Sequence, residues 1–178
     1  MLGDSITENW KYADPDLFQH NRLDRGISGQ FSGQILLRFY QDVVALKPRA
    51  VHIMAGTNDL GQEGNPAFGD DDIINNMRAM IDMAKANGVR VVVASIPPAS
   101  GFFTAPKAKP ATRVPRLNQR LEALAKERGV IYVDYYSLLA DPAGGMRADL
   151  TSDGVHPNRK AYALMRPLTK EALGRSLR

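Results

Sequence analysis

The chain lacks cysteine entirely, which excludes disulfide bonds, thiolate metal sites and a cysteine nucleophile. It also lacks any long apolar run, so no membrane-spanning helix is expected. A dense basic tract is missing as well, because the 23 Lys and Arg residues are scattered and the net charge is only +4. We therefore expect no nucleic-acid partner. The length, without repeats or a low-complexity linker, favours one domain over residues 1–178.

What remains is an ordinary globular composition, 44% hydrophobic and 24% charged. Short apolar runs predict buried parallel strands at residues 49–55, 89–96 and 130–133. A weaker strand is expected at residues 25–27. Residues 1–2 would belong to a further strand that ends just before Ser5, and that strand looks truncated.

Apolar residues at helical spacing lie between these runs. They predict helices over residues 36–46, 70–87 and 117–128, and from residue 158 onward. Pro48 should close the first helix, and Pro167 should kink or restart the last one. Strands that alternate with helices predict an α/β sandwich around a parallel sheet.

Four polar blocks follow the predicted strands. They are Gly3-Asp4-Ser5-Ile6, Gly26-Ile27-Ser28-Gly29, Gly56-Thr57-Asn58-Asp59 and Asp153-Gly154-Val155-His156. In open α/β sheets, ligands bind beyond the carboxyl ends of the strands. All four blocks fall at that edge, so we expect them to form one site.

The first and last blocks hold the parts of an acyl-transfer site. A serine needs a base within hydrogen-bond reach, and the base needs an orienting acid. Ser5 is the candidate nucleophile, His156 the candidate base and Asp153 the candidate acid. Ser5 is alternatively a helix N-cap, and Asp153 is alternatively a turn former before Gly154.

The two middle blocks could supply an oxyanion hole. Glycine permits unusual backbone angles, so the Gly29 N–H can point into a site. The Asn58 side chain offers an N–H without adding charge, and the Ser5 backbone N–H is a third candidate donor. A plain turn at Gly29 and loop capping by Asn58 are the alternatives.

These four blocks, in this order, resemble the SGNH/GDSL hydrolase family of serine esterases and lipases. The resemblance spans residues 3–157, with Ile6 where the family's short name has Leu. It implies a three-layer α/β/α sandwich with a flavodoxin-like, mainly five-stranded parallel sheet. It also implies a hydrolase without a cofactor, and no clustered metal-ligand pattern is visible.

Three aromatic residues are candidates for the substrate pocket. Trp10, the only tryptophan, follows the nucleophile closely and could form a pocket wall, although surface packing explains it equally well. Phe102 and Phe103 lie on a Pro-containing loop after the fourth strand, near the expected site. Two adjacent phenylalanines there suggest a loop that shapes the acyl or leaving-group pocket.

We therefore predict a serine esterase that acts on short-chain carboxylic esters through an acyl-enzyme on Ser5. A carbohydrate O-acetylesterase or acyltransferase with the same site is the alternative, and a non-catalytic binding module with a relic site is a third. The expected partner is a small-molecule or carbohydrate ester. No signal peptide is visible, and the shortened first strand suggests a trimmed chain or an internal start. A soluble protein is expected, and both a cytoplasmic and an exported location stay open.

Overall fold

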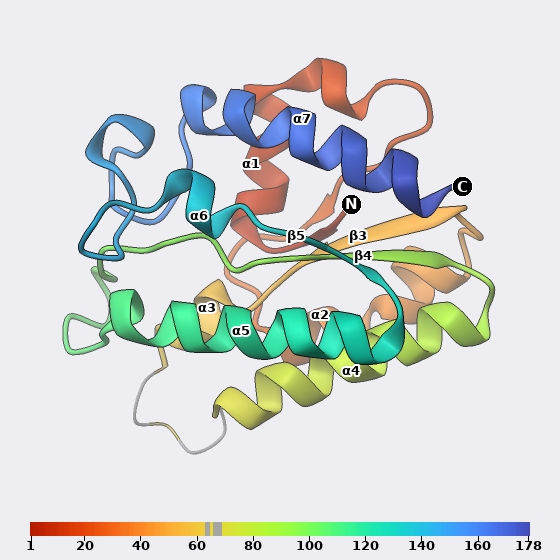
Figure 1. The fold of residues 1–178 in the computed structure, drawn as a ribbon, viewed down its shortest axis with the longest axis horizontal. Coiled ribbons are helices and arrows are strands. Elements are labelled where there is room, and N and C mark those ends of the chain that lie inside the picture. Colours follow the sequence, from red (N-terminus) through yellow and green to blue (C-terminus); the bar gives the residue numbers. More distant parts are fainter. Residues whose placement is uncertain (63–64, 66–68) are drawn as a thin grey trace.

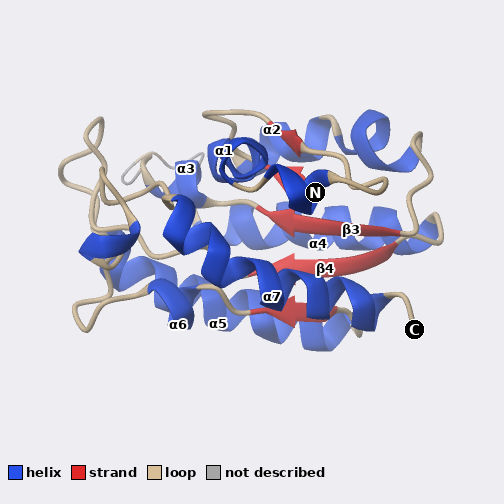
Figure 2. Cartoon of the chain, turned by 90° about the horizontal axis from the view of Figure 1, so that it is seen from above, coloured by secondary structure: helices blue, strands red, loops and turns tan. Residues whose placement is uncertain are grey.

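The computed structural model describes residues 1–62, 65 and 69–178. Its centre is a sheet of five parallel strands in the order β2-β1-β3-β4-β5 (Figures 1 and 2). The strands are β1 (Leu2–Gly3), β2 (Arg25–Gly26), β3 (Ala50–Met54), β4 (Arg90–Ala94) and β5 (Ile131–Val133). This order and the parallel pairing confirm the predicted sheet.

The three longer strands, β3, β4 and β5, contain β-branched residues, because such side chains fit a pleated buried surface. In β4, Val91 and Val93 join the apolar cluster on one face of the sheet. Val92, between them, joins the cluster on the opposite face. This alternation is the period of two expected for a strand that is buried on both faces.

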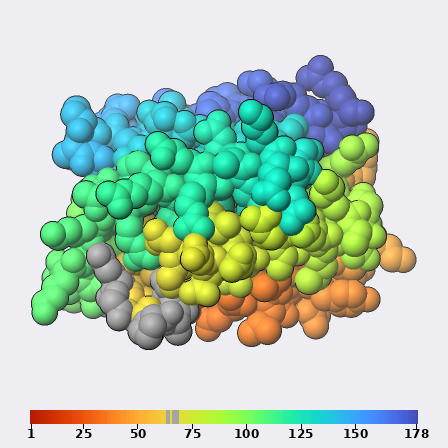
Figure 3. All heavy atoms as spheres, turned by 60° about the horizontal axis from the view of Figure 1, so that its bottom comes forward, coloured from red at the N-terminus to blue at the C-terminus, as the bar shows by residue number. Residues whose placement is uncertain are grey.

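Helices cover both faces of the sheet, as Figures 1 and 2 show. The face nearest the chain termini carries α1 (Ser5–Ala13), α6 (Tyr136–Leu139) and α7 (Arg159–Ser176). The other face carries α2 (Ser32–Leu37), α4 (Asp70–Ala86) and α5 (Pro110–Arg128). Figure 3 brings this second face forward, with α4 and α5 side by side across it. The three-layer α/β/α architecture is thereby confirmed.

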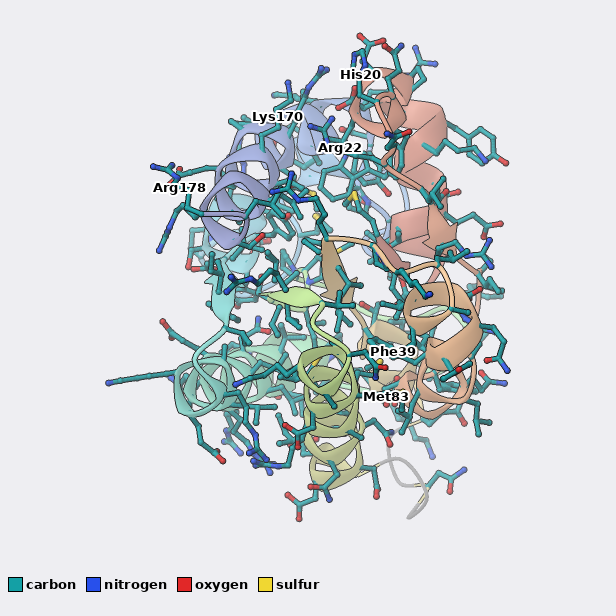
Figure 4. All side chains as sticks on the ribbon, turned by 90° about the vertical axis from the view of Figure 1, so that its right-hand side faces the viewer. His20, Arg22, Phe39, Met83, Lys170 and Arg178 are labelled. Carbon is teal, nitrogen blue, oxygen red and sulfur yellow. The ribbon has the colours of Figure 1, made fainter. Side chains whose placement is uncertain are left out.

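Shorter helical segments connect these layers. They are α3 (Thr57–Leu60), a 3₁₀ turn η1 (Pro15–Phe18), a π-helical turn η2 (Tyr40–Val44) and a 3₁₀ turn η4 (Ala148–Leu150). Figure 4 views the molecule from the amino ends of the strands, opposite the edge where the four sequence blocks are expected. Phe39 and Met83 lie on the α4 side of the sheet, and Arg22 and Lys170 lie on the α7 side.

One helix prediction needs correction, and one of the two alternatives expected at Pro167 is excluded. The single helix expected over residues 36–46 is divided, because α2 ends at Leu37 and the chain continues into the π-helical turn η2. At the break, the Arg38 side chain turns toward the ends of β1 and β2 and binds carbonyl oxygens there. The last helix does not restart at Pro167, since α7 runs through this residue as one element.

Candidate active site

Ser5 stands where β1 passes into α1. The Asp4 carboxylate caps the helix by accepting a hydrogen bond from the Ile6 N–H at 2.9 Å. Ser5 is therefore the first residue of α1, where a backbone N–H has no acceptor within the helix. Within the described part of the chain, no acceptor binds the Ser5 N–H. Asp4, and not Ser5, takes the capping role that the sequence left open.

The Ser5 hydroxyl lies in hydrogen-bond contact with a histidine 151 positions away. Ser5 Oγ and His156 Nε2 are 3.0 Å apart. On the other side of the ring, His156 Nδ1 lies 2.6 Å from Asp153 Oδ2. The structure thus brings the three predicted residues into the chain of contacts in which an acid orients a base beside a serine.

The Asp153 carboxylate is held mainly as the charged form. Its Oδ1 accepts hydrogen bonds from the backbone N–H groups of Val155 and His156, at 2.9 and 2.8 Å. Partial burial alone would raise the pKa of Asp153, but the hydrogen bonds from His156 and Val155 lower it well below its usual range. An ionised Asp153 favours a proton on His156 Nδ1, which leaves Nε2 free to accept the Ser5 proton.

Contacts between its own residues hold the loop that carries Asp153 and His156. Thr151 pairs with Pro157 in an isolated antiparallel bridge. Thr151 Oγ1 also accepts the Gly154 N–H at 3.0 Å, where Gly154 has a positive φ of 81°. These contacts fix the loop although its outer edge faces solvent: the side chains of His156 and Asp153 are 38% and 50% exposed.

Gly29, on the loop between β2 and α2, and Asn58, in the short helix α3, lie at the same edge of the sheet. Gly29 has a φ of 77°, and the space around it is open. The Asn58 side chain donates one N–H to the Gln30 carbonyl oxygen at 3.0 Å, directly beside Gly29. In the described residues, the Gly29 N–H and the second Asn58 N–H have no acceptor. Both groups thus remain available to an anionic oxygen.

Asp59 stabilises the segments that carry these donors. Its carboxylate accepts the Ser32 backbone N–H at 2.9 Å and the Ser32 hydroxyl at 2.5 Å. Asn76 donates to the same hydroxyl at 2.9 Å. Asp59 therefore joins the start of α3 to the start of α2.

Asp4 has an unusual environment beside the nucleophile. Its side chain is buried, and its Oδ2 has no hydrogen-bond partner in the described structure. Burial raises the pKa of Asp4 to about 7, and the nearby charge of Asp59 adds to this effect. The neighbouring His156 and the Ile6 N–H act in the opposite direction.

The predicted pocket residues separate into three environments. Trp10 is completely buried, and its ring packs 5.2 Å from the Tyr162 ring and 5.9 Å from the Tyr135 ring. This corrects the expectation of a pocket wall or a surface position, because α1 turns this ring into the core. Phe103 is fully exposed and encloses nothing, whereas Phe102 is half-buried against the apolar cluster on the α4 side.

The other two histidines lie outside the site. His20 is exposed. His52 is buried, its Nε2 lies 3.0 Å from the Tyr135 hydroxyl, and burial lowers its pKa to about 3. His52 is therefore neutral and has a structural role in the core.

Three polar residues were missed by the sequence analysis. Glu8, Gln30 and Arg38 hydrogen-bond the loops of the site to one another. Glu8 lies one helical turn after Ser5, which is a weak signal of proximity. Arg38 falls inside the stretch that was predicted as one continuous helix, so its spacing gave no signal.

A separate cavity of about 670 Å³ opens at the amino ends of the strands, and its lining includes Leu2, His52 and Lys170. None of the four sequence blocks lines it in the described structure, so it is distinct from the Ser5 site. The described residues also contain no group of three His, Asp or Glu side chains placed to hold a metal ion. Of the helices that the structure describes, none combines the length and hydropathy needed to cross a bilayer.

Comparisons with known proteins support the fold described above. A candidate acylhydrolase from Bacteroides fragilis has a TM-score of 0.93 at 38% identity, with 99% of this chain and 86% of that one covered. A GDSL-like lipase from Bacteroides thetaiotaomicron gives 0.92 at 39%, with 98% and 86% covered. An acetylxylan esterase from Geobacillus stearothermophilus shares the fold, with a TM-score of 0.75 at 19% identity over 97% and 91% of the two chains.

A curated relative matches a smaller part of the chain. It is the uncharacterized lipoprotein YqeF of Bacillus subtilis, 30% identical over 109 residues, and the match spans 52% of this chain and 45% of that protein. The profile of the GDSL-like lipase/acylhydrolase family matches residues 1–164, which include every residue of the Ser5 site. The chain therefore belongs to the GDSL-like lipase/acylhydrolase family.

Proposed function

We propose that the protein is a serine esterase that hydrolyses short-chain carboxylic esters through an acyl-enzyme on Ser5. One observation carries this proposal: Ser5 Oγ lies 3.0 Å from His156 Nε2, and His156 Nδ1 lies 2.6 Å from Asp153. This is the separation at which an imidazole can take a proton from a hydroxyl. Membership of an acylhydrolase family supports the same reaction class.

In the first half-reaction, Ser5 Oγ bonds to the ester carbonyl carbon while its proton passes to His156 Nε2. The carbonyl electron pair moves onto oxygen and forms a tetrahedral oxyanion. Collapse of this intermediate breaks the ester C–O bond, and the alcohol leaves with the proton from His156. Asp153 keeps the ring oriented and stabilises the imidazolium throughout.

In the second half-reaction, a water molecule replaces the alcohol. His156 takes a proton from this water as the oxygen attacks the acyl carbon, and returns the proton to Ser5 Oγ on collapse. We assign the oxyanion to the Ser5 N–H, the Gly29 N–H and the second Asn58 side-chain N–H, because none of the three has a competing acceptor among the described residues. The carboxylic acid then leaves, and no cofactor enters either half-reaction.

The exposed edge of the site bears on the substrate. The leaving alcohol receives its proton from His156, so it must lie on the His156 side. This side is open, since the His156 and Asp153 side chains are 38% and 50% exposed. Because this side is open to solvent, carbohydrate O-acetylesterase or acyltransferase activity is our second candidate. The acetylxylan esterase that shares this fold supports it.

We further propose that residues 1–178 form a single catalytic domain. A non-catalytic binding module remains the competing hypothesis from another functional class. The complete set of hydrogen bonds from Ser5 through His156 to Asp153 argues against it, because a relic site has no selection for this geometry.

The test is initial-rate hydrolysis of p-nitrophenyl acetate, p-nitrophenyl octanoate and acetylated xylooligosaccharide. Wild type should prefer acetyl esters, and Ser5→Ala should lower kcat by about 10⁴-fold or more. His20→Asn is the matched control, because His20 is exposed and has a positive φ of 57° that Asn tolerates. A fluorophosphonate that leaves Ser5 unlabelled, with no ester turned over, would support the binding module instead.

A further inference from the structure

The loop between β2 and α2 carries Gly29 with little packing to hold it. Ile27, Ser28 and Gly29 are all exposed, and a methyl group added at Gly29 would touch nothing within 4 Å. An oxyanion donor nevertheless needs a fixed direction, because misplacement by about 1 Å can cost on the order of 10²-fold in rate. Polar contacts on either side of Gly29 supply this restraint.

The first contact comes from α1. Glu8 Oε2 accepts the Ser28 backbone N–H at 2.8 Å, immediately before Gly29. Glu8 reaches the loop because α1 and β2 approach very closely: a Cβ at Gly26 would lie only 2.2 Å from the Glu8 nitrogen. The helix that begins at Ser5 thus holds the residue before Gly29.

The second contact comes from Arg38, at the break after α2. Its Nε donates to the Gln30 side-chain oxygen at 2.6 Å, immediately after Gly29. Its two terminal nitrogens donate to the Gly3 carbonyl oxygen at 2.8 Å and to the Arg25 carbonyl oxygen at 2.9 Å. One planar guanidinium therefore connects β1, β2 and the Gly29 loop, and it does so in a fixed fork geometry.

The Arg38 side chain is itself restrained and only 14% exposed. Asp42, one helical turn later, accepts a hydrogen bond from it and a second one from Arg25. Burial would raise the pKa of Asp42, but hydrogen bonds to Arg25 and Arg38 outweigh this effect and lower it. Gln30 extends the network, because its carbonyl oxygen accepts the Asn58 side-chain N–H at 3.0 Å.

We propose that Glu8 and Arg38 are positioning residues that aim the Gly29 N–H, and through Gln30 the Asn58 amide, at the oxyanion formed on the Ser5 adduct. Neither residue touches the reacting atoms. Glu8 holds the backbone N–H of Ser28 and Arg38 holds the side chain of Gln30, so the two contacts restrain the residues on both sides of Gly29. The catalytic part of this inference rests on the proposed esterase activity, whereas the restraint of the loop does not.

The test combines loop dynamics with kinetics in Arg38→Met and Glu8→Ala. Amide order parameters of Ser28, Gly29 and Gln30 should fall from about 0.85 toward about 0.6 in both variants. On p-nitrophenyl acetate, kcat should fall by about 10-fold to 100-fold with KM nearly unchanged, since only transition-state contacts are lost. Glu8→Gln keeps an acceptor oxygen and should restore most of the activity.

Arg25→Gln is the matched control, because it removes the other Asp42 ion pair while the Arg38 contacts stay in place. It should leave the order parameters and kcat unchanged. Unchanged order parameters in Arg38→Met and Glu8→Ala would overturn the proposal, as would a mobile loop with wild-type kcat. If the wild type itself turns over no ester, the proposed function fails, and with it the catalytic part. The order parameters then still decide whether Glu8 and Arg38 restrain the loop.

Discussion

The acid–base part of the site and the oxyanion part are built in opposite ways. Asp153 and His156 lie three positions apart on one loop, whose own backbone N–H groups bind the carboxylate. The oxyanion part joins α1, the Gly29 loop and α3 through hydrogen bonds that span 20 to 35 positions in the chain. The first part depends on local conformation, whereas the second depends on the packing of the whole sheet edge.

Asp153→Asn tests the acid–base part, and of these variants we expect it to lower kcat most. The Asn oxygen can still accept the backbone N–H groups of Val155 and His156, so the loop should keep its shape. The ring would lose the partner that fixes its tautomer, and kcat should fall by about 10²-fold to 10⁴-fold. Steady-state kinetics with p-nitrophenyl acetate measure this loss. Asp149→Asn, which removes an exposed ion-paired carboxylate nearby, is the control. Equal activities of Asp153→Asn and wild type would remove Asp153 from the mechanism.

Asn58→Ala tests the oxyanion part, and we expect it to lower kcat less than Asp153→Asn does. It removes one oxyanion donor and the bond to the Gln30 carbonyl oxygen. Loss of one such donor typically lowers kcat by about 10²-fold to 10³-fold while KM changes little. Asn58→Asp has the same shape but carries negative charge, so it should be at least as damaging. An Asn58→Asp variant with wild-type kcat would show that no oxyanion forms beside this residue.

Asp4→Asn should have the smallest effect, and we expect it in the pH dependence of the free energy of unfolding. In the folded state the pKa of Asp4 is raised to about 7, above the ordinary value of 3.8. The folded state therefore favours the protonated form, and wild type should lose stability as pH rises from about 4 to about 7. Asp153, with its lowered pKa, has the opposite sign and loses its contribution in acid.

Urea unfolding at about pH 5 and about pH 8 measures this difference. The wild-type free energy of unfolding should fall by on the order of 1–4 kcal/mol from Asp4 between these values. Asp4→Asn should remove most of that fall, because its amide does not titrate. A variant with the wild-type pH dependence would assign the effect to other groups, with Asp24, whose pKa is also raised by burial, as the first candidate.

The same contrast explains which features the sequence could predict. The five strands and the helices α4, α5 and α7 are signalled by local patterns of apolar residues and by turn residues such as Gly129. Asp153 and His156 are three positions apart in the sequence and could be paired by spacing alone. The contact from Ser5 to His156 was predictable because both residues follow strands at the same edge of the sheet.

The features that could not be predicted from the sequence depend on contacts between distant segments. Arg38 sits in a helical pattern, and only the folded sheet edge shows that its side chain binds Gly3 and Gln30. Trp10 follows Ser5 closely, but its position on α1 directs the ring inward onto Tyr162. Phe103 belongs to an apolar pair, yet only Phe102 finds packing partners.

The bridge between Thr151 and Pro157 closes the loop that carries His156 at its two ends. Its ends are held together by their own bridge, and the Asn158 N–H continues the pairing to the Leu150 carbonyl oxygen at 2.8 Å. The segment keeps its acid, its base and their spacing together, and the Ser100 N–H attaches it to the loop after β4 by donating to the Gly154 carbonyl oxygen at 2.8 Å. Insertions elsewhere at this edge of the sheet can then diversify substrate choice without disturbing proton transfer. The oxyanion part offers no such unit, since altering it means altering three segments together.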